Sequence, residues 1–224
     1  MDTSPTLNFP ALVIDGSGST VFAGVLGQHS QWISQSSQAG SPLEQLFPTV
    51  EATLEDAGLK LSEIESYVYC EGPGSVLGLR LCAMAIETWS RLYPSSAHTF
   101  SYNTLQLCAK LLSVDTHLPS KTLLVSDWKK GVWNAIQINK GTISSTTVAD
   151  DAAIADWDGD VYHLPQRKGW QKPPANAQTI AYAPERLPEL LDHTNWLLPT
   201  VGVKLYSSGI NTFAKWTPDR HRAS

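Results

Sequence analysis

The stretch from Glu71 to Leu81 is the most distinctive pattern in the chain that could do chemistry, Glu-Gly-Pro-Gly-Ser-Val-Leu-Gly-Leu-Arg-Leu. Its glycines allow a sharp turn and close backbone packing, and a helix that begins after the turn offers unpaired backbone N–H groups beside a strand end. Such groups bind phosphate in many proteins. Gly78 is followed by Leu79-Arg80, however, and not by the Lys-Ser or Lys-Thr of a Walker A loop. The turn by itself therefore does not predict phosphate binding.

Asp15 is a second candidate, because it follows a predicted strand at 11–14 and opens the turn Asp-Gly-Ser-Gly-Ser-Thr before a returning strand at 21–26. A strand, an Asp-Gly turn and a second strand also open the actin-like, sugar-kinase-like and Hsp70-like folds. There the Asp and the turn approach metal and phosphate, so Asp15 and Ser17 are candidate, vestigial nucleotide contacts. The alternative is that Asp15 caps its own hairpin turn. Asp127, after a predicted strand at 122–125, has the same two interpretations.

Signatures of metal binding and of nucleophilic catalysis are absent from the sequence. The six histidines are widely spaced, and none forms His-x-x-x-His or His-Glu-x-x-His. No Gly-x-Ser-x-Gly elbow is present. Cys70, Cys82 and Cys108 lie in apolar runs without a Cys-x-x-Cys pair, which predicts buried free thiols and a reducing compartment. We therefore expect no metal, no cofactor and no catalytic residues.

The helix that follows the glycine-rich turn, predicted at 79–92, is apolar on two sides. Helical spacing predicts one stripe that faces the core, made of Leu77, Leu81, Met84, Ala85, Thr88 and Leu92. A second apolar side consists of Leu79, Cys82, Ala83 and Ile86. Because a helix that is apolar on nearly all sides is buried on nearly all sides, we expect one side to cover a sheet and the other to meet a second helix or a partner protein.

A further helix is predicted from Ser41-Pro42 to Gly58, with a Ser cap, Pro in the first turn and Gly after the last turn. Pro48 is expected to kink this helix or to shift its start. One of its faces carries Leu43, Leu46, Phe47, Val50 and Leu54. The remaining pattern predicts strands at 97–101, 122–125 and 161–164, and helices at 103–113, 149–157 and 184–193.

This order of elements predicts an α/β chain with two ribonuclease-H-like lobes. We expect an N-terminal lobe at 1–100, which carries the partner-binding helices, and a C-terminal lobe at 101–224. The last helix or the tail is expected to pack back on the first lobe.

The motif Gly-Pro-Gly-Ser-x-x-Gly-Leu-Arg after a short strand resembles the TsaB (YeaZ) family. Members of this family are non-catalytic partners in the threonylcarbamoyl modification of the tRNA adenosine next to the anticodon. The similarity is greatest at 11–26 and 42–92 and extends through 99–134. It implies a two-lobed actin-like (ASKHA, ribonuclease-H-like) α/β fold with mixed sheets, a cytoplasmic location and no catalysis by this chain alone.

The same resemblance implies a set of partners. A TsaD-type protein would be bound by the helices near 43–57 and 76–92, a TsaE-type ATPase would join the pair, and tRNA would be engaged indirectly. A homodimer is expected when the partner is absent. The function so predicted is that of a scaffold subunit of the tRNA threonylcarbamoyladenosine (t6A) complex. The predicted partner interface consists of Leu43, Leu46, Phe47, Val50, Val76, Leu79, Arg80, Ala83, Ile86 and Glu87.

The chain departs from the family pattern in two places. The His that relatives carry before the first helix is missing, and Asp127-Trp128-Lys129-Lys130 stands where relatives have Asp-Ala-Arg. The alternative function is an active enzyme of the same superfamily, either an ATP-dependent small-molecule kinase or an M22-type metallopeptidase. The kinase needs a second phosphate loop, and no Asp-x-Gly-Ser or Asp-x-Gly-Thr repeat follows residue 120.

Composition excludes several other classes of protein. A net charge of −5 over 224 residues argues against a surface that binds nucleic acid throughout. No apolar run approaches the roughly 20 residues of a membrane helix, and we expect no signal peptide. The end of the chain, 213–222, is basic and aromatic, which fits either RNA contact or a solvated tail.

Overall fold

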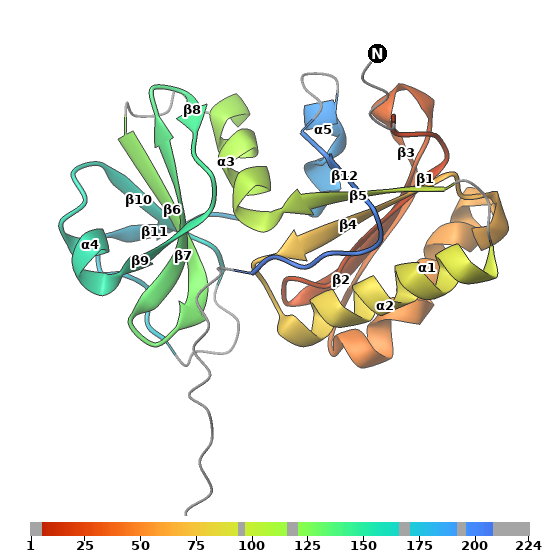
Figure 1. The fold of residues 1–224 in the computed structure, drawn as a ribbon, viewed down its shortest axis with the longest axis horizontal. Coiled ribbons are helices and arrows are strands. Elements are labelled where there is room, and N and C mark those ends of the chain that lie inside the picture. Colours follow the sequence, from red (N-terminus) through yellow and green to blue (C-terminus); the bar gives the residue numbers. More distant parts are fainter. Residues whose placement is uncertain (1–5, 94–96, 116–120, 166–170, 192–195, 208–224) are drawn as a thin grey trace, which may run out of the picture.

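The computed structural model describes residues 6–93, 97–115, 121–165, 171–191 and 196–207. The described residues form two mixed β-sheets that lie side by side, with helices on their faces (Figure 1). The predicted tail at 213–222 lies outside the described residues.

The first sheet has the strand order β12-β5-β4-β1-β2-β3. β1 pairs antiparallel with β2, and β2 pairs antiparallel with β3, whereas β1, β4 and β5 are parallel. β12 returns from the far end of the described chain and pairs antiparallel with β5. The bounds are Ala11–Asp15 for β1, Thr20–Leu26 for β2, Trp32–Ala39 for β3, Ser66–Gly72 for β4, His98–Asn103 for β5 and Leu198–Thr200 for β12.

The second sheet repeats this pattern, with the order β11-β10-β6-β7-β8 and with β9 paired to β7. β6 pairs antiparallel with β7 and parallel with β10, which in turn is parallel to β11. Each sheet thus combines an antiparallel hairpin with parallel strands. The bounds are Lys121–Lys129 for β6, Val132–Asn139 for β7, Thr142–Ile143 for β8, Thr147–Asp150 for β9, Asp160–His163 for β10 and Ala177–Thr179 for β11.

The helices cover the sheets as layers. α1 and α2 lie on one face of the first sheet, and α3 and α5 lie on the other (Figure 1). α3 is shared between the lobes, because Leu107 and Leu111 pack on the first sheet while Leu105 and Leu112 pack on the second. The bounds are Pro42–Ala57 for α1, Val76–Leu92 for α2, Thr104–Asp115 for α3, Asp151–Ala155 for α4 and Pro188–Leu191 for α5. Short 3-10 turns lie at Gln28–Ser30, Leu61–Glu63 and Pro184–Arg186.

Most of the predicted elements are confirmed, including the strand pair around Asp15 and the helices on either side of β4. α1 begins at Pro42 and runs through Pro48 without a break, so the expected shift of its start is wrong. Gly58 ends α1 in the left-handed conformation at φ 66°, as its predicted cap position requires. The helix predicted at 184–193 is a 3-10 turn followed by α5, and 192–195 lie outside the described residues.

The two mixed sheets confirm the two-lobed α/β fold that the order of elements predicts. The predicted division between residues 100 and 101 falls inside β5, a central strand of the first sheet. This division stays a prediction.

Candidate functional site

The glycine-rich turn brings the start of α2 against the β1–β2 turn. A Cβ atom on Gly78 would lie 1.9 Å from the carbonyl oxygen of Gly16, and one on Gly74 would lie 2.5 Å from the Cβ of Ser17. The Ser75 N–H donates to the Ser17 carbonyl at 2.8 Å, and the Ser75 hydroxyl accepts from the Gly78 N–H at 3.3 Å. Gly74 and Gly78 therefore allow the two turns to touch through their backbones, and a residue with a Cβ atom would not fit at either position.

α2 is rotated so that its second apolar side faces the sheet. The buried positions of the helix are Gly78, Leu79, Cys82, Ala85, Ile86 and Trp89. Leu77 is 52% exposed, Met84 64% and Leu92 64%. The expectation that these three residues form a core stripe is therefore wrong. A helix with two apolar sides does not reveal which side is buried, and the Gly16–Gly78 contact sets the rotation.

This rotation also corrects the predicted partner interface. Leu79 and Ile86 are 6% and 1% exposed, so they belong to the core of this chain. Leu46 and Val50 of α1, at 1% and 3%, are likewise packed under the helix pair. All four are covered by the chain's own sheet and helices, because α1 and α2 pack on each other as well as on the strands.

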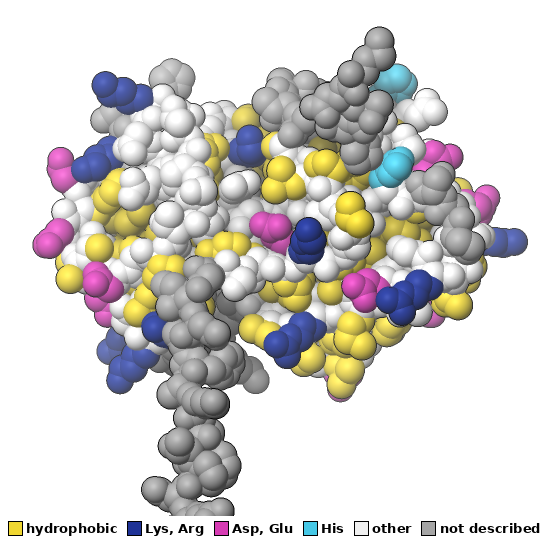
Figure 2. Space-filling model, viewed as in Figure 1, with side chains coloured by type: hydrophobic (Ala, Val, Ile, Leu, Met, Phe, Trp, Pro, Cys, Tyr) yellow, Lys and Arg dark blue, Asp and Glu magenta, His cyan; other side chains and the backbone are white. Residues whose placement is uncertain are grey.

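The other six predicted interface residues reach the surface in whole or in part. They lie together with Leu77, Met84 and Leu92, which the prediction of the interface missed, and we call the whole set the helix-pair surface. Figure 2 shows apolar side chains interspersed with charged ones along the lower edge of this view, where Figure 1 places α1 and α2. The helix-pair surface consists of Leu43 and Phe47 of α1 and of Val76, Leu77, Arg80, Ala83, Met84, Glu87 and Leu92 of α2.

Phe47 joins the two helices of this surface. Its side chain is 49% exposed, and its ring meets the Trp89 ring edge-on with centroids 6.4 Å apart. Trp89 is buried and also stacks at a tilt on Tyr67 of β4, at 6.0 Å. Phe47 thus packs on a buried aromatic pair, which fixes the position of its ring on the surface.

The second candidate region is a cavity of about 90 Å³ between the lobes. Ser17 and Asp127, two of the predicted nucleotide contacts, come together in its wall although they belong to different sheets. Ser126, which also lines the cavity, has a buried hydroxyl with no hydrogen-bond partner among the described residues. The complete lining is Ser17, Gly18, Ser19, Thr20, Pro73, Gly74, Thr104, Ser126, Asp127, Leu164, Pro165 and Tyr182.

Asp15 does not line this cavity, because tyrosines cover it. The Tyr102 hydroxyl donates to Asp15 Oδ2 at 2.5 Å, and the Tyr182 hydroxyl donates to the same oxygen. Asp15 Oδ1 accepts from the Ser17 N–H at 2.6 Å. The last contact is the local turn cap that was the alternative to nucleotide binding. The two tyrosines were missed at the sequence level, since neither lies in a recognisable motif.

The electrostatics around Asp15 keep its neighbours neutral. Burial, and then the charge of Asp15, raises the pKa of both Tyr102 and Tyr182 well above the usual value. Burial and the same charge raise the pKa of the Cys70 thiol. All three cysteines are free and buried, as predicted. Thiols held in the protonated form are poor nucleophiles.

The residues that the structure describes contain no group of three or more His, Cys, Asp or Glu side chains that could hold a metal ion. No helix in the same residues is long and apolar enough to cross a membrane.

The fold and the cleft define a two-lobed actin-like α/β protein. A family model described as TsaD, tRNA N6-adenosine threonylcarbamoyltransferase, matches residues 40–152, which is half of the chain. The chain belongs to this family.

Several solved structures resemble this chain, including two with a TM-score of 0.55. One is YeaZ from Pseudomonas aeruginosa, 17% identical with a TM-score of 0.55, over 75% of this chain and 85% of that chain. The other is an uncharacterized protein with similarity to peptidase YEAZ from Pseudomonas aeruginosa, 16% identical with a TM-score of 0.55, over 77% and 86%. A search of the curated proteins finds no match. The family match and the shared fold confirm the resemblance to the TsaB (YeaZ) proteins.

Proposed function

We propose that this protein is a non-catalytic scaffold subunit in tRNA t6A biosynthesis, and that it binds and stabilises a TsaD-type transferase through the helix-pair surface. The family match supports a role in this modification. The observation that carries the binding role is the cluster of exposed apolar side chains on α1 and α2, with Leu43, Met84 and Leu92 each more than 60% exposed. Large apolar side chains gathered on one exposed face and bordered by charged ones are typical of interaction sites.

The charges on the two helices favour a specific partner. α1 exposes Glu44, Glu51, Glu55 and Asp56, whereas α2 exposes Arg80 and Arg91 with Glu87 between them in the sequence. The α1 side of the surface is therefore acidic, whereas the α2 side carries both signs of charge, and this asymmetry orients a partner with a complementary pattern. A second copy of this chain would compete for the same surface, giving a homodimer when the transferase is absent.

Two observations support a role without catalysis. Asp15 is engaged by Tyr102, Tyr182 and the Ser17 backbone, so its oxygens already have partners within the chain. Burial and the charge of Asp15 also raise the pKa of the Cys70 thiol, which leaves this thiol a poor nucleophile. In this proposal the protein works without a metal or cofactor of its own, a TsaE-type ATPase joins the pair, and tRNA is contacted through the partners. The unpaired cysteines favour the reducing cytoplasm as the compartment.

The test is light scattering after size-exclusion chromatography, on this protein alone and mixed with the TsaD-type protein of the same organism. We expect a one-to-one complex, and we expect Met84→Glu to weaken it by at least about tenfold, since a charge would be buried in the apolar centre of the interface. Val114→Glu is the matched control, because Val114 is similarly exposed, at 58%, but belongs to α3.

Absence of a complex with the unaltered protein would contradict the proposal. Equal loss of binding with both variants would contradict the assignment of the helix-pair surface as the interface.

A further inference from the structure

The chain crosses from the second sheet back to the first through residues 180–191, which we call the strap. At its start, Ile180 and Tyr182 pack against the core cluster formed by α3 and the second sheet. At its end, Leu187 and Leu190 are buried in the core of the first sheet. Between them, the Glu185 carbonyl accepts from the Trp32 indole N–H of β3 at 2.7 Å. The strap therefore contacts both lobes.

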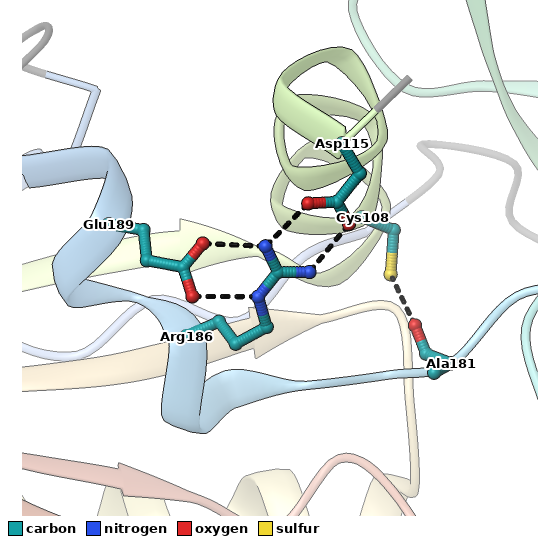
Figure 3. Close-up of polar contacts among 5 residues, drawn as sticks. All are labelled: Cys108, Asp115, Ala181, Arg186 and Glu189. Atoms are coloured by element: carbon teal, nitrogen blue, oxygen red, sulfur yellow. Dashed lines mark hydrogen bonds and ion pairs between the residues drawn. The ribbon is translucent and has the colours of Figure 1, made fainter.

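Arg186 fastens the strap to α3, which lies between the lobes (Figure 3). Its guanidinium donates to both oxygens of Asp115, the last residue of α3, at 2.6 Å each. The same group holds Glu189 of α5 at 2.7 and 2.6 Å. About two turns before Asp115 in α3, the Cys108 thiol donates to the Ala181 carbonyl at 3.9 Å (Figure 3). Two-pronged contacts of arginine with carboxylates fix direction as well as distance.

Tyr182 is the residue of the strap that enters the cleft. One side of its side chain lines the interlobe cavity. Its hydroxyl donates to Asp15, accepts from the Ser17 hydroxyl at 3.2 Å and lies 3.7 Å from the Cys70 sulfur. Neither Asp15 nor Cys70 lines the cavity. The Tyr182 ring therefore separates the cavity from the Asp15 carboxylate and from the Cys70 thiol.

We propose that the strap closes the interlobe cleft from within. In this proposal the Tyr182 side chain covers Asp15, and we call it the stopper. Arg186 holds the strap to α3, and we call it the anchor. The phenols of Tyr102 and Tyr182 occupy the acceptor positions of Asp15 Oδ2 that a cation or a hydroxyl-bearing ligand would need. Access to Asp15 requires the stopper to leave, and the anchored strap opposes that movement.

The three cysteines provide the test, because they lie at different distances from the strap. Cys70 is behind the stopper, Cys108 is beside the strap, and Cys82 is a buried residue of α2 in a different core cluster. Labelling with iodoacetamide under native conditions, followed site by site with mass spectrometry, measures the opening around each thiol. Tyr182→Ala should raise the labelling rate of Cys70 at least about tenfold and leave that of Cys82 unchanged.

Two further variants show whether Cys70 is labelled because the Tyr182 ring is missing or because the protein as a whole is less stable. Tyr182→Phe keeps the ring and should leave Cys70 protected within about threefold of the unaltered protein. Arg186→Met alters only the partly exposed anchor and should raise labelling of both Cys70 and Cys108, whereas Arg91→Met on α2 should change none of the three rates.

The proposal is overturned if Cys70 stays as protected in Tyr182→Ala as in the unaltered protein. It is also overturned if the Phe variant exposes Cys70 as much as the Ala variant, or if Arg186→Met accelerates labelling of all three thiols equally.

Discussion

The carbonyl oxygen of Gly16 lies where a Cβ atom of Gly78 would stand, at 1.9 Å. A Cβ atom on Gly16 would in turn meet the backbone of Gly78 at 3.1 Å. The first turn of α2 and the β1–β2 turn therefore touch backbone to backbone. This contact sets the position and the rotation of α2 on the sheet, and with them the composition of the helix-pair surface.

Gly78→Ala should therefore destabilise the protein by about 2 kcal/mol or more, because the colliding atom belongs to the backbone and cannot rotate away. Urea unfolding measures the change in the free energy of unfolding. Gly18→Ala in the neighbouring turn is the control, since its nearest neighbour is the Tyr182 ring at 3.5 Å, an ordinary contact. Similar losses for the two variants would contradict the importance of the Gly16–Gly78 contact.

Ala83→Arg tests the helix-pair surface from its centre. Ala83 is partly exposed on α2 between Arg80 and Glu87, so a long side chain has room to extend into solvent. We expect the melting temperature to change by less than about 4 °C, which corresponds to about 1 kcal/mol in a chain of this size. Binding to the TsaD-type protein should be lost. A fall in melting temperature well beyond this range in the isolated chain would place Ala83 in the core instead.

Alkaline pH should unfold the protein through its buried phenols and thiols. The pKa values of Tyr102 and Tyr182 are raised by burial and by Asp15, that of Tyr67 is raised to about 12, and burial raises that of Cys108 to about 12. The unfolded chain releases these protons near pH 9 for thiols and pH 10 for phenols, while the folded chain retains them. Stability is therefore complete below pH 9 and falls as the pH rises beyond it.

The free energy of unfolding, measured in urea between pH 8 and 11, checks this expectation. Tyr182→Phe removes one buried phenol, so above pH 10 its stability should fall less steeply than that of the unaltered protein, by about 1.4 kcal/mol per pH unit. An identical slope for the two proteins would show that Tyr182 ionises in the folded state as easily as in the unfolded one.

Ser126→Ala should leave the stability unchanged within about 0.5 kcal/mol or raise it, because the change removes a buried hydroxyl that has no partner among the described residues. Ser66→Ala is the matched comparison. The Ser66 hydroxyl is also buried, but it accepts from the Asn8 N–H at 2.9 Å, so its loss should cost about 1 kcal/mol. A loss of this size at Ser126 would mean that ordered water satisfies its hydroxyl.

Local sequence patterns predicted the helices and strands well. The cleft was predicted only in part, because it is formed by residues that are far apart in the sequence. The Ser41-Pro42 start and the Gly58 end of α1 are visible because caps are local. Ser17, in the turn after the first strand, and Asp127, after a later strand, were predicted as candidate nucleotide contacts, and the structure brings them to one cavity. Tyr182 is 167 residues from Asp15, and no local signal announces a contact over that separation.

α2 separates most clearly what the sequence determined from what the tertiary structure decided. The sequence alone determined that a helix follows the glycine-rich turn, that it is apolar on two sides, and that one side must be left for another cover. It could not determine which side, because Leu77 and Met84 are as apolar as Leu79 and Ile86 and a helical wheel has no reference direction. The tertiary structure decided this through the Gly16–Gly78 contact, which rotates Leu79 and Ile86 into the core and leaves Leu77 and Met84 exposed.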